Sequence, residues 1–215
     1  MPLIKQYGLS GVDVWVWKIT ETVDELLGMV PAECATYAVA RFSSKKRCCE
    51  WLAVRAIVAQ QFGDGVRIVY DRAGKPVLEG RRGNISISHT KGYAVFAFSP
   101  DNEVGVDVEL LSRKVIHLAG HFMSVVPSVD IYGEGAGFIA LLHWCAKEAL
   151  FKIVGDLGGN FKDNILVTPF EPAADGSMRI EVVGLGCDSR FMAQYCVDGD
   201  LLFVLCRGAR DDEKR

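Results

Sequence analysis

The feature that most constrains the fold is an order of patterns that occurs twice along the chain. In each half, one long segment with helical periodicity precedes a run of short alternating segments. Apolar residues recur three and four positions apart in a helix but two apart in a strand. Helices are predicted at 43–62 and 138–153. The sequence therefore predicts an α+β fold made of two similar halves, each a helix with an antiparallel sheet.

Turn residues separate the predicted strands. The strands lie at 12–18, 66–70, 75–78, 84–89, 93–98 and 104–109 in the first part, and at 164–170, 178–183, 191–197 and 201–207 in the second. Asp198-Gly199 predicts a tight hairpin turn between the last two strands. The weakly patterned segment 113–137 predicts a helical fragment and a mobile loop.

Composition narrows the class of protein. The net charge is -3 with both signs spread along the chain, so no basic field of the kind that nucleic-acid binding requires is present. No apolar stretch reaches the roughly 20 residues of a membrane helix, and the first ten residues do not resemble a signal peptide. The seven cysteines match no zinc spacing. We expect a cytoplasmic protein with reduced thiols and no membrane attachment.

The strand at 104–109 carries two acids on one side. Because side chains alternate along a strand, its three valines face one way, and Asp107 and Glu109 face the other. Gly105 is expected to leave the acidic face open to a ligand. Two carboxylates with an open face favour a magnesium ion that is shared with ligand phosphates. The alternative is a solvated strand face at the edge of the protein.

The second helix has a polar edge. Trp144, Glu148 and Lys152 are four residues apart and share one helix face. Glu148 could supply a third carboxylate to a metal or act as a base, and Lys152 could meet a phosphate. The alternative is a surface ion pair between Glu148 and Lys152, worth only a few tenths of a kcal/mol.

A third group of candidates lies in the first half. His89 ends the strand that contains Ser88, and Lys75-Pro76 follows a glycine in a turn. With Arg47 on the first helix, these residues could bind a phosphate. A lone histidine at a strand end is otherwise a structural hydrogen-bonding group, and the basic run 45–47 is by default a solvated helix face.

Taken in order, these segments resemble the surfactin-type 4'-phosphopantetheinyl transferases. That family has a GKP-like segment, a strand that ends in Ser-His, a strand of the form (V/I)G(V/I)D-x-E and a helix of the form W-x-x-KEA-x-x-K. The matching segments here are 74–76, 87–89, 104–109 and 144–152. Each is a weak signal alone, and together they are specific. The resemblance implies a pseudo-dimer of two fused halves, 1–108 and 109–215, with the active site between them.

The resemblance also assigns roles to residues. It implies that Asp107, Glu109 and Glu148 bind Mg²⁺, and that Lys152 contacts the pyrophosphate of coenzyme A. A further set is implied to hold the adenosine end with its 3'-phosphate: Arg47, Lys75, Pro76, Ser88 and His89. Basic residues that the family carries before the first helix are absent from 31–36, so Arg41 or Lys46 would take their place.

The implied reaction moves the phosphopantetheine arm of coenzyme A to a serine of an apo acyl or peptidyl carrier protein and releases 3',5'-ADP. Glu148 would accept the serine proton and Lys152 would stabilise the leaving oxygen. The partners are therefore coenzyme A and a carrier protein, and a monomer is expected. Three alternatives remain: a metal-dependent phosphohydrolase, a coenzyme-A- or nucleotide-binding protein without turnover, and a structural domain.

Overall fold

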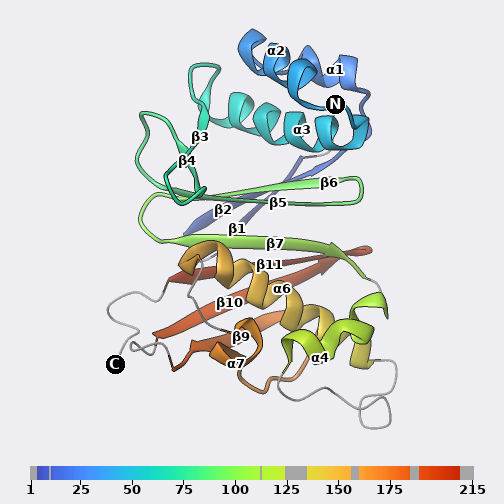
Figure 1. Ribbon diagram of the computed structural model, residues 1–215, viewed down its shortest axis with the longest axis vertical. Coiled ribbons are helices and arrows are strands. Elements are labelled where there is room, and N and C mark those ends of the chain that lie inside the picture. The colour runs from blue at the N-terminus through green and yellow to red at the C-terminus, as the bar shows by residue number, and fades with distance from the viewer. Residues whose placement is uncertain are drawn as a thin grey trace. The chain divides into compact units, whose positions relative to one another are not determined.

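The chain forms two compact units, Met1–Asp101 and Asn102–Arg215 (Figure 1). The computed structural model describes residues 4–9, 11–111, 113–123, 135–155, 160–184 and 189–208. The second unit contains the whole of strand β7 (Val104–Leu110), within which the predicted boundary at 108/109 falls.

The first unit places helices on an antiparallel sheet. The sheet order is β1 (Ile4–Leu9), β2 (Val12–Lys18), β6 (Tyr93–Ser99) and β5 (Asn84–Thr90). The helices are α1 (Val23–Leu27), α2 (Ala32–Arg41) and α3 (Lys45–Phe62). Strands β3 (Ile68–Tyr70) and β4 (Pro76–Leu78) form a separate hairpin.

Helix α3 has the predicted ends. The Ser44 side chain accepts a hydrogen bond from the Arg47 backbone N–H at 3.4 Å, which satisfies one of the free donors of the first turn. Gly63 ends the helix at φ 92°, a value that favours glycine. The buried residues of α3 pack against the sheet in one core, which includes Leu52, Ala56, Ile57, Trp15, Trp17, Phe96 and Phe98.

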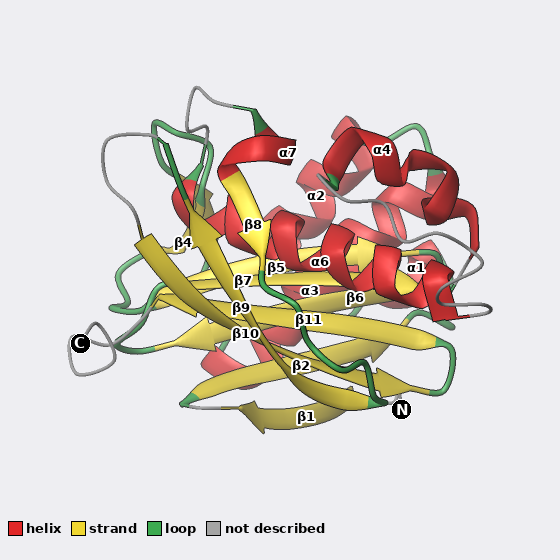
Figure 2. Cartoon of the chain, turned by 90° about the horizontal axis from the view of Figure 1, so that it is seen from below, coloured by secondary structure: helices red, strands yellow, loops and turns green. Residues whose placement is uncertain are grey.

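The second unit places one long helix on a five-stranded antiparallel sheet. The strand order is β7, β11 (Leu201–Gly208), β10 (Ser189–Asp198), β9 (Asp175–Val182) and β8 (Ile165–Val167). The long helix is α6 (Ala136–Val154), and the short ones are η1 (Arg113–Leu118), α4 (Ala119–Phe122) and α7 (Phe161–Asn164). Figure 2 shows α6 lying across one face of this sheet.

The core of the second unit lies between α6 and the sheet. Its buried residues include Leu142, Cys145, Ala146, Ala149 and Leu150 of the helix, with Ile180, Ala193, Leu202, Val204 and Cys206 of the strands. Gly155 ends α6 at φ 70°. The helix is therefore fixed against β7 and β11, and residues on its sheet-facing side have defined neighbours.

The mixed architecture with antiparallel sheets agrees with the predicted α+β class. The patterns missed β1, α1 and α2, and the strand predicted at 164–170 is shorter, since α7 precedes β8 there. The helical fragment predicted after residue 113 is confirmed, and the predicted loop at 124–134 falls outside the described residues. None of the described helices has the length and apolar character needed to cross a membrane.

Candidate functional site

Strand β7 turns its acidic side toward helix α6. In the pairing of β7 with β11, Asp107 lies opposite Val204 and Glu109 lies opposite Leu202. Residues directly opposite each other in paired strands share a face of the sheet. Because Val204 and Leu202 belong to the core beneath α6, Asp107 and Glu109 lie on the side of the sheet that this helix covers.

Gly105 has a different role from the one expected. A Cβ at Gly105 would lie 1.9 Å from the carbonyl oxygen of Ala149 and 3.2 Å from a side-chain carbon of Ile153, both on α6. The expectation that Gly105 opens the acidic face to a ligand is therefore wrong. The missing side chain instead lets the helix backbone approach the strand, which brings Glu148 and Lys152 close to the acids of β7.

Lys152 of α6 binds the strand directly. Its Nζ donates to Asp107 Oδ1 at 2.9 Å and to the backbone oxygen of Val106 at 2.7 Å. The side chains are 27% and 10% exposed, so this ion pair is largely screened from water. The surface pair between Glu148 and Lys152 that the spacing allowed is thus replaced by a contact between two elements.

The same two strand acids shift the pKa of Glu148. Burial raises the pKa of Glu148, and the negative charges of Asp107 and Glu109 also raise it, whereas Lys152 lowers it. The Cys145 thiol is fully buried one turn earlier on α6, and its pKa is raised by burial and by the charges of Asp107 and Glu109. Three carboxylates and one lysine are therefore near enough to influence one another.

The donor chemistry of this cluster suits a hard divalent cation, since Asp107, Glu109 and Glu148 offer only carboxylate oxygens. The raised pKa of Glu148 comes first from burial and then from the negative charge of Asp107, and a bound cation would offset that charge. Within the described ranges, however, no three Asp, Glu, His or Cys side chains are close enough together to hold a metal ion. As the side chains stand, Lys152 contributes the positive charge beside Asp107.

The first unit contains a separate basic cluster at the start of α3. Arg47 Nη1 lies 3.2 Å from His89 Nε2, which brings together two predicted residues that are 42 positions apart. Beneath them, the buried Glu50 carboxylate lies 3.7 Å from His89 Nδ1, 3.9 Å from Arg47 and 3.6 Å from Lys46. The buried Glu50 carboxylate thus contacts three basic side chains, and each of these side chains is partly exposed to solvent.

The remaining predicted residues of the first unit lie on two other elements. Ser88 is buried on β5, next to His89. Lys75 closes the turn between β3 and β4: its backbone N–H donates to Asp71 Oδ1 at 2.9 Å, and its carbonyl accepts from the Asp71 N–H at 3.0 Å. Pro76 begins β4. The backbone N–H and carbonyl of Lys75 are thus used within the turn, and its side chain is half-buried.

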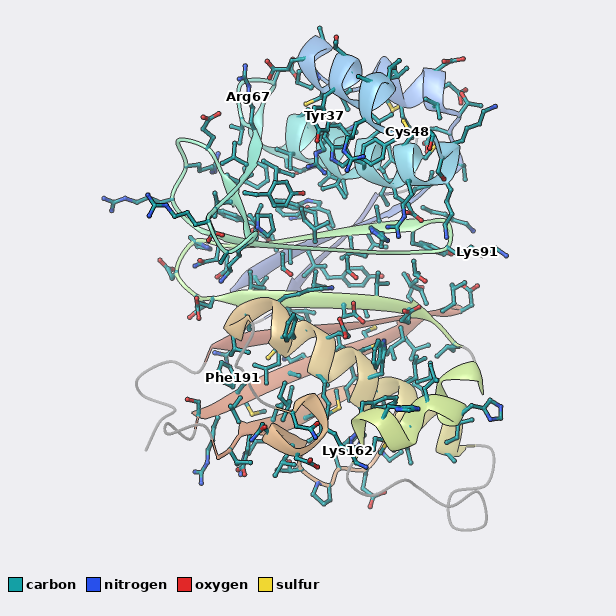
Figure 3. The ribbon with its side chains drawn as sticks, viewed as in Figure 1. Tyr37, Cys48, Arg67, Lys91, Lys162 and Phe191 are labelled. Atoms are coloured by element: carbon teal, nitrogen blue, oxygen red, sulfur yellow. The ribbon has the colours of Figure 1, made fainter. Side chains whose placement is uncertain are left out.

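Sequence reasoning missed Glu50, Cys145 and Lys147. Glu50 lies three residues after Arg47, a spacing that places both on one helix face and could have revealed the pair. Lys147 is 2% exposed, and its Nζ donates to the backbone oxygen of Lys162 at 3.0 Å, which ties α6 to α7. Figure 3 labels Lys162 at the α7 end of the second unit. No local pattern indicates that a lysine beside Glu148 faces inward.

Comparison with known proteins gives a distant similarity. No family model matches the chain. Over 115 residues, it is 29% identical to a protein of Synechocystis sp. named "Putative 4'-phosphopantetheinyl transferase"; the match covers 48% of this chain and 47% of that protein. The chain thus spans about half the length of the curated relative it matches. This similarity supports the phosphopantetheinyl transferase superfamily at a distance.

Proposed function

We propose that the protein is a magnesium-dependent 4'-phosphopantetheinyl transferase that modifies an apo acyl or peptidyl carrier protein. The observation that carries the proposal is the cluster in the second unit, where Lys152 binds Asp107 at 2.9 Å and Glu148 is influenced by both strand acids. Asp107 and Lys152 are 45 positions apart along the chain, and the packing of α6 against β7 brings them together.

In the proposed reaction, the carrier serine oxygen bonds to the phosphorus that bears the pantetheine arm. The bond from that phosphorus to the bridging oxygen breaks, and its electron pair leaves with 3',5'-ADP. Transfer of this kind depends mostly on positioning and on charge neutralisation. Bound at Asp107, Glu109 and Glu148, magnesium would supply Lewis-acid polarisation of the phosphate oxygens.

The residues of the second unit then have separate tasks. Glu148 accepts the serine proton, directly or through a water. Lys152 places a positive charge beside the leaving oxygen. Its position in the last turn of α6 is also favourable for a cation, because the helix dipole is negative there.

The first unit is proposed to bind the nucleotide end of coenzyme A. Arg47, which lies 3.2 Å from His89, is proposed to present a charged donor to the 3'-phosphate, with His89 beside it. Lys46 belongs to the same cluster through Glu50 and can replace the basic residues missing from 31–36. Ser88 and the turn at Lys75-Pro76 are proposed to contact the adenosine.

We further propose that the protein is of the surfactin type and that its two units are fused halves of one pseudo-dimer. The support is that each unit places a long helix, α3 or α6, on one antiparallel sheet. The four sequence motifs also occur in the order of that family. A monomer is expected on this basis, because one chain supplies both halves.

The decisive test is transfer to a carrier. The protein is incubated with coenzyme A, magnesium and several purified apo carriers, and each carrier is measured by intact mass spectrometry. We expect at least one carrier to gain a single phosphopantetheine arm, with 3',5'-ADP as coproduct. A carrier whose acceptor serine is changed to alanine should stay unmodified, and Asp107→Ala should abolish transfer while the circular dichroism spectrum is retained.

Other outcomes would favour another function. Release of free 4'-phosphopantetheine or phosphate without carrier modification would indicate a phosphohydrolase. Binding of coenzyme A without any turnover would indicate a binding protein. If calorimetry detects no magnesium-dependent binding of coenzyme A, the carboxylate cluster has a structural role and the proposal is wrong.

A further inference from the structure

The first unit contains a cavity that the proposed transferase function does not use. It has a volume of about 310 Å³ and lies between α2, α3 and the segment that leads into β3. Its lining includes Tyr37, Trp51, Arg55, Arg67 and Tyr70, of which Figure 3 labels Tyr37 and Arg67. None of the residues assigned to coenzyme A or magnesium lines it.

Arg55 is a buried cation in the wall of this cavity. The residue is 7% exposed, and its guanidinium lies over the Trp51 ring, 3.9 Å from the centroid. Its hydrogen-bond acceptors are the Trp51 carbonyl at 3.5 Å and the Tyr70 hydroxyl at 3.3 Å, both uncharged. Among the residues that the structure describes, no carboxylate forms an ion pair with Arg55.

A buried charge without a countercharge needs an explanation, because arginine is rarely buried unless it is paired. Burial lowers the pKa of Arg55, as expected for a cation whose surroundings do not compensate its charge. The ion pair at the cavity rim does not neutralise it, since Glu33 is already paired with Arg67. The lining therefore carries one net positive charge.

The rest of the lining is aromatic and aliphatic. Tyr37 stacks on Trp51 with ring centroids 5.2 Å apart and an angle of 26° between the planes. Tyr37 and Tyr70 are 52% and 56% exposed, so their rings are accessible to a ligand. Val58 and Val66 belong to the apolar part of the lining. Such a surface favours a flat apolar ligand over a hydrated ion.

We infer that this cavity is a binding site for a small planar aromatic carboxylate. The ring would lie against Tyr37 and Tyr70, and the carboxylate would pair with Arg55 in a charge-assisted contact. A single cation matches a single negative charge, and a volume of 310 Å³ is at the small end of ligand cavities. The inference is independent of the proposed transferase activity, because it uses different residues.

The test is titration of the full chain with 2-naphthoate, followed by tryptophan fluorescence and by NMR of the indole N–H groups. We expect saturable binding at one site that shifts the Trp51 signal, assigned with Trp51→Phe. The neutral isostere 2-naphthamide should bind roughly 10-fold more weakly, because it lacks the charge that pairs with Arg55. Arg55→Met should cause a similar loss, and the exposed Arg82→Gln serves as the matched control with unchanged affinity.

Three results would overturn the inference: equal affinity for the acid and the amide, no shift of Trp51, or displacement of 2-naphthoate by 3',5'-ADP, which would make the cavity part of the nucleotide site. Arg55 is buried, so Arg55→Met could unfold the protein. In that event, the affinities of the unmodified chain for 2-naphthoate and 2-naphthamide still test the inference. Tyr37→Ala, at an exposed position, should weaken 2-naphthoate binding several-fold without loss of structure.

Discussion

Lys152 on α6 donates a 2.9 Å hydrogen bond to Asp107 on β7, across a sequence separation of 45 residues. The contact joins the long helix of the second unit to the edge strand of its sheet. It also sets the charge environment of Glu148, since Asp107 and Lys152 act on its pKa in opposite directions. The contact therefore links the stability of this unit to the ionisation of its proposed base.

The first prediction concerns the energy of this contact. Lys152→Met and Asp107→Asn should each lower the free energy of unfolding by about 1–3 kcal/mol, because each leaves a largely buried charge without its partner. The double variant should lose less than the sum of the two, since neither charge then remains. Urea unfolding of the four proteins measures this coupling. Strictly additive losses would show that the two charges do not stabilise each other.

A second prediction follows from the close approach of Gly105 to α6. Gly105→Ala places a methyl group 1.9 Å from the Ala149 carbonyl oxygen, so strand and helix must separate. The free energy of unfolding should fall by at least about 1–3 kcal/mol, and coenzyme A turnover should fall with it. Gly120→Ala is the control, because a Cβ there meets nothing within 4 Å. Equal stability of both variants would contradict the observed packing.

The third prediction concerns Glu148 in chelator-treated protein. Its folded pKa is raised above 4.5, so the folded state holds the proton to higher pH than the unfolded state does. Ionisation of Glu148 should therefore reduce stability as the pH rises above 4.5. Glu148→Gln should remove this decline, and the exposed Glu171→Gln should not. The measurement is the free energy of unfolding across that pH range. If it depends on pH in the same way in all three proteins, the pKa of Glu148 is not raised.

The fourth prediction addresses the basic cluster of the first unit. Arg47→Gln should weaken binding of 3',5'-ADP roughly 10- to 100-fold, as expected when one charge-assisted contact is lost. The salt dependence of binding should also decrease, because a charge is removed. Lys45→Gln, two residues away and exposed, is the matched control. Isothermal titration calorimetry at two salt concentrations tests both effects, and equal affinities for the two variants would exclude Arg47 from the nucleotide site.

A fifth prediction concerns the buried Lys147. Burial lowers the pKa of Lys147 from 10.5 to about 8. Between these values the unfolded chain binds the proton and the folded protein does not, so the free energy of unfolding should rise with pH. Lys147→Met should flatten this rise relative to Lys45→Met. The same slope in both variants would indicate that Lys147 titrates like an exposed lysine.

Local signals in the sequence were sufficient to predict most of the helices and strands. Ser44 and Gly63 marked the ends of α3, and both act as its caps. The sequence also contains the capping box that starts α1: Thr22 N–H donates to the Glu25 side chain at 2.7 Å. Strand β1 has no comparable local signal at its ends, and it becomes a strand by pairing with β2. Pairing of this kind depends on a partner strand and cannot be read from β1 alone.

In the candidate site too, local patterns predicted the arrangement within each element, and the contacts between elements could not be predicted. Strand alternation placed Asp107 and Glu109 on one face, and the helical repeat placed Glu148 and Lys152 on one edge, because both periods are fixed by backbone geometry. The sequence by itself determined which residues could act together within one element. It did not determine that Lys152 would pair with Asp107 instead of Glu148.

Only the tertiary structure decided the partners between elements. It assigned Gly105 to a helix contact, placed Glu50 of α3 beside His89 of β5, and turned Lys147 inward. The physical reason is that these contacts join segments far apart in the chain. Which of them form depends on how the helices and sheets pack, and packing is a property of the whole unit, which no local spacing encodes.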